Sequence, residues 1–312
     1  MVAVALVILW QERIEMKEFG SFYLVEKPAG YADTKSWPAV VDLDEAAAGT
    51  ARWRESATEK GFFVLAPRAP GASWRTADGG FVRACLSDAK TRFRLAPERV
   101  LLSGFSAGAD LAGEVAAAQP DLFAGCAPFM SRAGPPTPRT RLAYYIVSGS
   151  DDSAGPKGAA RKAASDLANE GMDVLAREAP GVGHARPGAE EHRRVLEWFE
   201  GKAPAASDAG TADRYLEAGR YLDASLASIG LMDRPALQAV SRIQLRRVEA
   251  AGIVTLGSVE VSFANRKYAD ACLRCREAAV QFAWVPVGDR IRKRLGELEA
   301  DPRVKKALAA DD

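Results

Sequence analysis

The sequence predicts an α/β protein with a doubly wound, mostly parallel sheet, followed by a helix-rich C-terminal appendage. Short apolar runs alternate with helix-like segments as far as Lys202, which is the order expected of parallel strands joined by helices. After Lys202 the composition changes to small residues and proline, and long helical patterns follow. A length of 312 residues accommodates both regions.

The predicted strands and helices of the first region follow one another in order. Residues 13–19 alternate between apolar and polar side chains, and together with 22–25 they indicate a β-hairpin that turns at Gly20-Ser21. The later strands are short apolar runs typical of buried parallel strands. The predicted strands are 39–43, 61–66, 100–102, 124–127, 144–147 and 174–176, and the predicted helices are 46–60, 77–93, 107–119, 159–170 and 190–199.

The C-terminal region is predicted to be a separate helical module. Its small residues and proline indicate a linker over 203–210, so the first domain is expected to span 13–202 and the module 211–312. The pattern does not contain a catalytic constellation, and it does not identify a protein partner for this module. The expected elements are a helical hairpin over 211–229 and 235–250, a β-like segment around 259–261, and helices beginning at Lys267 and Asp289.

Residues 1–12 allow two interpretations. The run 2–10 contains nine apolar residues, which is too short to span a membrane as a helix, so no stable membrane span is predicted. Its length matches either an extra buried strand or the apolar part of a degenerate or truncated export leader. Because the strands of the fold are complete without it, the leader is favoured, and with it an exported or periplasmic location over a cytoplasmic one.

Charge and cysteine content exclude several classes of function. The 42 basic and 41 acidic residues give a net charge of +1, which offers no electrostatic basis for binding nucleic acid or an anionic membrane. Cys272 and Cys275 have the spacing of a redox motif, but they stand in a helix-like stretch without a preceding strand. They are predicted to be half-buried small residues, and no metal site is predicted because no other pair of Cys or His with zinc-ligand spacing lies near them.

The motif with the strongest chemical content is Gly104-Phe105-Ser106-Ala107-Gly108. It follows an apolar strand and precedes a helix, which is the context of a nucleophile elbow. A sharp turn there lifts the serine hydroxyl clear of the backbone, and only very small residues fit beside it. The pattern by itself occurs by chance in roughly one chain in ten of this length, so an ordinary glycine-rich turn is the alternative.

A serine nucleophile needs a base and an acid, and the chain offers few candidates. Of its two histidines, His184 lies in a glycine-rich loop between the predicted strand 174–176 and the last helix of the domain, where the base is expected. His192 lies among charged helix residues and is predicted to be on the surface. Asp151 and Asp152 both follow the strand 144–147, and one of them is expected to be a turn or helix-cap carboxylate.

Residues 13–200 resemble the α/β-hydrolase superfamily, and most closely its carboxylesterase/phospholipase-like and polyhydroxyalkanoate-depolymerase-like serine esterases. The resemblance implies an α/β-hydrolase fold without a cofactor, with Ser106 as nucleophile and His184 as base. In those families the acid ends an H-G-x-x-D pattern, and the same pattern on 148–152 selects Asp152, with Ser148 in the place of the histidine. The segments that carry the resemblance are 62–68, 97–108, 149–152 and 181–184.

The oxyanion hole is where this sequence departs from those esterases. They carry His-Gly after the third strand, whereas this chain has Asp44-Glu45. The expected donors are the backbone N–H groups of Ala107 and of Glu45 or Ala46. One such donor contributes about 2.7–4 kcal/mol. A carboxylate about 4 Å from the oxyanion would oppose it by up to about 4 kcal/mol at an effective dielectric constant of 20.

The sequence therefore supports two alternative functions, which belong to different classes. The first is a serine esterase that acts on a small-molecule or polymer ester, with Arg68 and Phe105 as candidate substrate-binding residues. Esters are favoured over peptides because the chain lacks the large extra domain that restricts access in oligopeptidases. The second is a non-catalytic α/β-hydrolase-like protein that acts through its C-terminal helical module, and the acidic pair Asp44-Glu45 motivates it.

Overall fold

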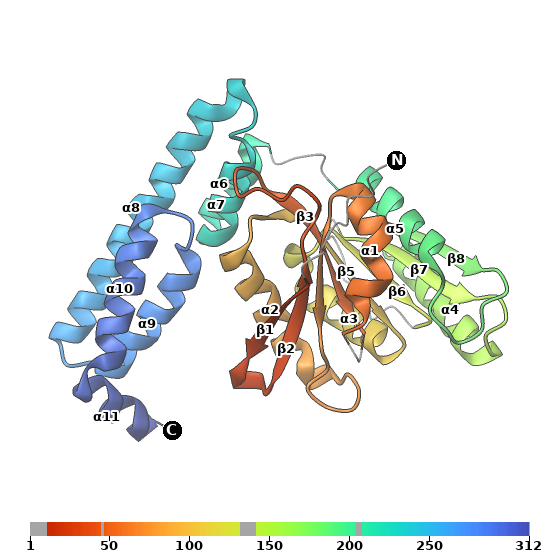
Figure 1. Cartoon of the computed structure of the whole chain (residues 1–312), viewed down its shortest axis with the longest axis horizontal. Coiled ribbons are helices and arrows are strands. Elements are labelled where there is room, and N and C mark those ends of the chain that lie inside the picture. The colour runs from red at the N-terminus through yellow and green to blue at the C-terminus, as the bar shows by residue number, and fades with distance from the viewer. Residues whose placement is uncertain (1–10, 45–46, 132–141, 204–207, 312) are drawn as a thin grey trace, which may run out of the picture. The chain divides into compact units, whose positions relative to one another are not determined.

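A computed structural model describes residues 11–44, 47–131, 142–203 and 208–311 of the chain. These residues belong to two compact units, each of which is described by itself (Figure 1). The first unit comprises Met1–Ala32, Trp37–Leu86 and Pro97–Ala205. The second comprises Asp33–Ser36, Ser87–Ala96 and Ala206–Asp312.

The described residues form an eight-stranded sheet in the order β1-β2-β4-β3-β5-β6-β7-β8. The first two strands form an antiparallel hairpin, and β2 also pairs antiparallel with β4. The pair β3 and β4 is parallel, as are the successive pairs from β5 to β8. The prediction of a mostly parallel sheet is confirmed. The strands are β1 Gln11–Met16, β2 Ser21–Glu26, β3 Trp37–Leu43, β4 Phe63–Pro67, β5 Leu95–Phe105, β6 Gly125–Phe129, β7 Ala143–Gly149 and β8 Asp173–Ala179.

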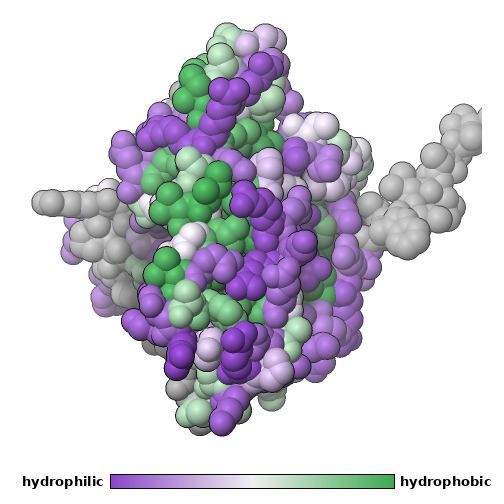
Figure 2. Space-filling model, turned by 90° about the vertical axis from the view of Figure 1, so that its left-hand side faces the viewer, coloured by the Kyte–Doolittle hydropathy of each residue, from purple (hydrophilic) through white to green (hydrophobic). Residues whose placement is uncertain are grey.

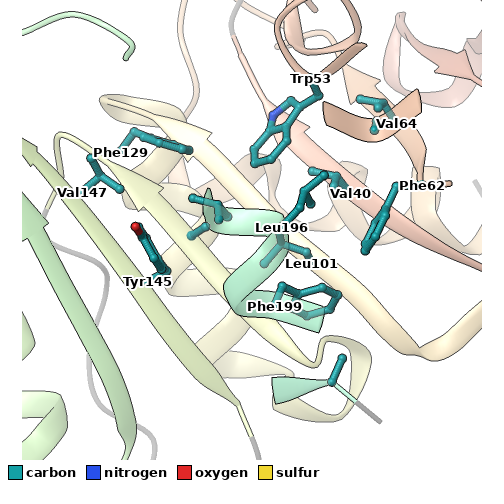
Figure 3. Packing of buried hydrophobic residues seen from close by; sticks show 14 of the residues in the cluster. Val40, Trp53, Phe62, Val64, Leu101, Phe129, Tyr145, Val147, Leu196 and Phe199 are labelled. Atoms are coloured by element: carbon teal, nitrogen blue, oxygen red, sulfur yellow. The ribbon is translucent and has the colours of Figure 1, made fainter. Parts of the chain in front are cut away.

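Two helices, α1 (Gly49–Lys60) and α5 (Ala189–Lys202), pack together against one face of the sheet (Figure 3). Trp53 from α1 and Phe199 from α5 are fully buried there, beside the inward side chains of six strands. Full burial of side chains of this size contributes about 1.5–3 kcal/mol each. The other helices of this region are α2 Gly79–Arg92, α3 Ala107–Ala118, which contacts β3 and β6, and α4 Ala154–Asn169, which contacts β7 and β8.

The helices of the second unit pack around a core of their own. Phe282, Val287 and Ile291 are buried at its centre, and Gly252 lies so close to Val287 that a Cβ atom there would be 2.4 Å from the valine side chain. Prolines at the first positions of two helices suit the missing N–H of that residue. The helices are α6 Ala209–Glu217, α7 Tyr221–Gly230, α8 Gln238–Ala264, α9 Tyr268–Gln281, α10 Pro286–Ala300 and α11 Pro302–Asp311.

Two of the secondary-structure predictions for this unit were wrong. The segment 211–229 is not one helix, because Gly219 adopts a positive φ of 70° and separates α6 from α7. Residues 259–261 are not a strand but part of α8. Val248, Gly252 and Val259 are buried on one side of α8, which is helical spacing, so packing overrides the local β preference of the valines.

The N-terminal prediction falls largely on residues 1–10, which lie outside the described residues. Gln11 and Glu12 belong to β1, so the first described strand begins two residues earlier than the sequence pattern indicated. Within the described ranges, no helix has the length and apolar character that crossing a membrane requires.

Apolar side chains also occur on the surface. The hydropathy view shows apolar residues interspersed with hydrophilic ones on the face that it presents (Figure 2). On α8 the exposed apolar residues include Ile243, Val254 and Val261.

The prediction that Cys272 and Cys275 are half-buried was wrong. Both side chains are fully buried on α9.

Candidate active site

A sharp strand-to-helix turn at Ser106 joins β5 to α3. Ser106 has φ 52° and ψ −119°, a backbone conformation that is strained for a residue other than glycine. Its N–H donates to the carbonyl oxygen of Phe129 at 3.0 Å, which ties the turn to β6. The flanking glycines are required by space, since a Cβ atom would lie 2.4 Å from the Gly108 oxygen at Gly104 and 1.9 Å from the Leu43 oxygen at Gly108.

The structure brings Ser106, His184 and Asp152 together in one line of contacts. His184 Nε2 lies 3.1 Å from Ser106 Oγ, and His184 Nδ1 lies 3.0 Å from Asp152 Oδ2. The three residues follow β5, β8 and β7, whose carboxyl ends meet at one edge of the parallel sheet. The imidazole is half exposed and the carboxylate is buried, so the line runs from solvent into the protein.

Asp152 is held as an ionised acceptor. Burial by itself would raise the pKa of Asp152, but hydrogen bonds from His184 and from the Ser153 N–H outweigh burial and lower the pKa. The Ser153 N–H donates to Asp152 Oδ1 at 2.7 Å, which leaves Oδ2 for the imidazole. Neighbouring Asp151 is exposed and accepts from the Ser150 hydroxyl, so of the two predicted alternatives Asp152 is the one that meets His184.

The loops that carry Asp152 and His184 are packed directly on each other. A Cβ atom at Gly149 would lie 2.2 Å from the Val182 carbonyl oxygen, so only glycine fits there. The Asp151 N–H donates to the same oxygen at 2.9 Å. Backbone contact between the two loops therefore fixes the distance between carboxylate and imidazole.

Of the two predicted substrate-binding residues, one lies beside this site. The ring of Phe105 lies 5.5 Å from the His184 ring, centroid to centroid. Arg68 is exposed, its N–H donates to the Phe22 carbonyl oxygen, and its guanidinium carbon lies 5.8 Å from the centre of the Phe22 ring. Across the described ranges, the recorded contacts of Arg68 join it to β2 and not to Ser106, His184 or Asp152.

Of the predicted oxyanion donors, only Ala107 lies within the described residues. Ala107 is the first residue of α3, where a backbone N–H has no partner within the helix. Glu45 and Ala46 lie outside the described residues. The carboxylate of Asp44, the predicted source of repulsion, lies 3.3 Å from Arg52 Nε and 3.4 Å from Arg186 Nε, so two guanidinium groups compensate its charge.

Sequence reasoning missed Arg186 and Asp42. The Arg186 side chain is 2% exposed, and its Nη1 donates to Asp42 Oδ1 at 3.0 Å, while Asp42 is fully buried. One signal was present in the sequence, because Asp42 interrupts an apolar strand. A carboxylate buried in such a strand requires a cationic partner.

The prediction that His192 is a surface residue was wrong. His192 is 1% exposed and lies 4.6 Å from the Trp53 ring and 5.2 Å from the Phe129 ring, centroid to centroid. Burial lowers the pKa of His192 and so favours the neutral imidazole. His192 shares its helix face with Val195 and Phe199, three and seven residues further on, which turn inward and bring it with them.

Among the described residues, no group of three or more His, Cys, Asp and Glu side chains is arranged to hold a metal ion. The candidate site consists of the serine, the imidazole and the carboxylate, together with the Ala107 backbone N–H. Such a set can move a proton from a hydroxyl to an imidazole and hold the resulting charge.

The comparisons with known proteins show similarity of fold and no match by sequence. No protein-family model matches, and no curated protein matches by sequence. A solved arylesterase is similar with a TM-score of 0.50 and 12% identity, over 62% of this chain and 85% of that chain. A thermostable esterase has a TM-score of 0.49 and 18% identity, over 63% of each chain. A putative dipeptidyl aminopeptidase IV from Bacteroides ovatus has a TM-score of 0.48 and 15% identity, over 62% of this chain and 35% of that one.

Proposed function

We propose that this protein, which has the α/β-hydrolase fold, cleaves carboxylic esters with Ser106 as nucleophile, His184 as general base and Asp152 as the acid of a triad. One observation carries the proposal. His184 lies within hydrogen-bonding distance of both other side chains, at 3.1 Å from Ser106 Oγ and 3.0 Å from Asp152 Oδ2. The likeness to a solved arylesterase supports an ester as the substrate class.

In the acylation step, Ser106 Oγ attacks the ester carbonyl carbon and His184 Nε2 takes the hydroxyl proton. The carbonyl electron pair moves onto oxygen, and the resulting tetrahedral oxyanion accepts from the Ala107 N–H and from a second backbone donor at Glu45 or Ala46. Removal of one such donor costs about 2.7–4 kcal/mol of transition-state stabilisation. The oxyanion then collapses, His184 returns the proton to the leaving alkoxide, and the alcohol departs from the acyl-enzyme.

In the deacylation step, water attacks the acyl carbon and gives its proton to His184. The second tetrahedral oxyanion collapses, Ser106 leaves with the proton from His184, and the carboxylic acid is released. Through both steps Asp152 accepts from the Nδ1–H of His184, holds the reactive tautomer and stabilises the imidazolium. An ionised Asp152 suits this role, and its lowered pKa keeps it ionised at neutral pH.

Of the two candidate substrate-binding residues, Phe105 is the one that we favour. Its ring is half-buried and lies next to the imidazole, where it offers an apolar surface to the acyl or alcohol group. Arg68 is a weaker candidate, since its recorded contacts are with Phe22 on β2. Both small-molecule and polymer esters fit this description of the site.

The test is covalent labelling with a fluorophosphonate, together with turnover of short p-nitrophenyl esters. The wild-type protein is expected to be labelled and to turn over, and Ser106→Ala is expected to lose both. Ser103→Ala is the matched control, because Ser103 lies three residues away, is fully buried and donates to the Ala127 carbonyl oxygen. Its labelling is expected to persist.

A folded wild-type protein that is neither labelled nor active would contradict the proposal. That result would favour the second function, a non-catalytic protein that acts through residues 211–312. The charge of Asp44, which motivated that function, is compensated by Arg52 and Arg186. The catalytic function is therefore the better supported of the two.

A further inference from the structure

A buried arginine lies two residues after His184, on the loop between β8 and α5. The Arg186 side chain is 2% exposed, although loops with glycine and proline usually carry their charged side chains in solvent. Burial of a guanidinium group is unfavourable unless charged partners surround it. The partners of Arg186 therefore indicate what the loop is fastened to.

Both anionic partners belong to β3 or follow it directly. Arg186 Nη1 donates to Asp42 Oδ1 at 3.0 Å, and Arg186 Nε lies 3.4 Å from Asp44 Oδ2. The chain makes room for this pair at Gly49, where a Cβ atom would lie 2.5 Å from Asp42 Oδ2. Arg52 supplies the second positive charge beside Asp44 at 3.3 Å, so two carboxylates face two guanidinium groups.

Two aromatic rings complete the surroundings of Arg186. Its guanidinium carbon lies 5.5 Å from the centre of the Phe105 ring and 5.8 Å from the centre of the Phe129 ring. Phe105 directly precedes Ser106, and its ring also lies 5.5 Å from the His184 ring. Phe105 therefore lies next to both the His184 imidazole and the Arg186 guanidinium group.

From this geometry we infer that Arg186 is a positioning residue that fastens the His184 loop to the ends of β3, β5 and β6 and so holds the imidazole in line with Ser106. The inference rests on the proposed function for its catalytic consequence. Arg186 acts through His184 and Phe105 and does not touch the reacting atoms. A displacement of the base by about 1 Å is enough to lower a rate about 100-fold, so such a tether matters.

The forked shape of the guanidinium group is part of the inference. Arg186 presents one nitrogen to Asp42 and another to Asp44 while its flat face lies near two rings. Lysine carries the same charge but cannot make this set of contacts at once. Arg186→Lys is thus expected to keep the fold and part of the activity, at a level between the wild type and a variant without the cation.

The decisive variant removes both members of the fully buried pair, Arg186→Met together with Asp42→Asn. Removal of both leaves no uncompensated charge at these two positions, and Asp44 keeps Arg52 as partner. We expect kcat to fall about 100-fold. KM is expected to change much less than kcat, because Arg186 itself does not touch the substrate.

The matched control is Arg177→Met together with Glu191→Gln. This pair also joins the β8 region to α5, with Arg177 Nε 2.9 Å from Glu191 Oε2 and the glutamate side chain 6% exposed. It makes no recorded contact with Phe105 or His184 within the described ranges. A loss of thermal stability without a change in kcat is expected for the control.

A second measurement does not depend on turnover. The chain has two histidines, so labelling with histidine that carries ¹⁵N at Nδ1 gives two ring signals, and the signal of His184 is identified by its absence in His184→Ala. In the Arg186→Met, Asp42→Asn variant, the Nδ1–H signal of His184 is expected to broaden or disappear, as its contact with Asp152 loosens. In the Arg177→Met, Glu191→Gln control it is expected to stay.

Wild-type kcat and an unchanged His184 signal in the Arg186 variants would overturn the inference and leave the proposed function standing. If the wild-type protein shows no serine-dependent turnover, the proposed function fails, and the His184 signal still decides whether Arg186 holds the imidazole. If the double variant does not fold, Arg186→Lys answers the question. Full kcat in that variant would overturn the inference.

Discussion

Two adjacent carboxyl groups at the end of β7 have different surroundings, and their replacement should have different effects. Asp152→Asn keeps the shape of the side chain but loses the charge that holds His184, so kcat for esters is expected to fall about 10⁴-fold. Asp151→Asn changes an exposed side chain whose recorded partner is Ser150, and kcat is expected to stay unchanged. Steady-state kinetics of the two variants test this, and equal effects would contradict the assignment of Asp152.

The charge of Asp152 also makes stability depend on pH. The folded state lowers the pKa of Asp152 below its ordinary value of 3.8, so the ionised carboxylate stabilises the fold above about pH 4. This contribution is lost as pH falls through the lowered pKa. The difference in unfolding free energy between wild type and Asp152→Asn is therefore expected to be full at pH 6 and to shrink below about pH 4. Urea denaturation at several pH values measures it, and a difference that grows on acidification would be inconsistent with this pKa.

At the scale of single residues, the sequence predicted those members of the candidate site that lie in the turn or loop after a predicted strand. Ser106 does so, Asp152 and His184 lie in the loops that follow later predicted strands, and two histidines left little choice of base. Arg186 could not be predicted in this way, because its partner Asp42 is 144 residues distant in the chain. Only the folded sheet brings the two together.

At the scale of elements, the approach of α3 to β3 depends on Gly108. A Cβ atom there would lie 1.9 Å from the Leu43 carbonyl oxygen, so Gly108→Ala must push α3 away from β3 and distort the turn at Ser106. A loss of about 1–3 kcal/mol of stability is expected, together with a marked loss of esterase activity. Urea denaturation and ester turnover measure both effects.

Gly158→Ala on α4 is the control for that substitution. A Cβ atom at Gly158 meets nothing within 4 Å, so alanine is expected to stabilise the helix by about 0.5–1 kcal/mol without change in activity. If both substitutions behave alike, the close approach of α3 to β3 is not what limits position 108.

Element types could be predicted from local pattern in the first unit, where apolar runs and helices alternate regularly. Local pattern gave wrong predictions for side chains on helices, because their burial depends on residues one or more turns away. Val259 and Val261 resemble a strand when read over three residues, but α8 extends over 27 residues and places only Val259 inside. His192 has charged neighbours in sequence, yet its position relative to Val195 and Phe199 buries it.

At the scale of the whole chain, a buried ion pair inside the second unit joins distant segments. Lys90 Nζ lies 2.7 Å from Asp223 Oδ1, and the two side chains are 4% and 10% exposed. Burial would raise the pKa of Asp223, but Lys90 and Arg220 together outweigh burial and lower it. The Trp284 indole N–H donates to the Lys90 carbonyl oxygen at 2.7 Å, so the same segment also contacts the turn between α9 and α10.

Asp223→Asn is expected to leave Lys90 buried without a carboxylate and to cost about 3–5 kcal/mol of unfolding free energy. Asp213→Asn is the control, since its partner Arg247 and Asp213 itself are largely exposed, and a cost of about 0–1 kcal/mol is expected. Chemical denaturation compares the two variants. Equal costs would mean that burial of the Lys90–Asp223 pair contributes little.

The composition of the second unit from three separate chain segments has a consequence for synthesis. Residues 87–96 leave the ribosome well before 206–312, and Lys90 precedes its partner Asp223 by 133 residues. At ordinary rates of translation this interval is on the order of ten seconds. During this time the Lys90 ammonium group has to remain in water or pair with another group. Truncation of the chain within 203–210 would separate residues 206–312 from the other two segments of the second unit. The two parts of the chain on either side of this segment therefore do not correspond to two independent units.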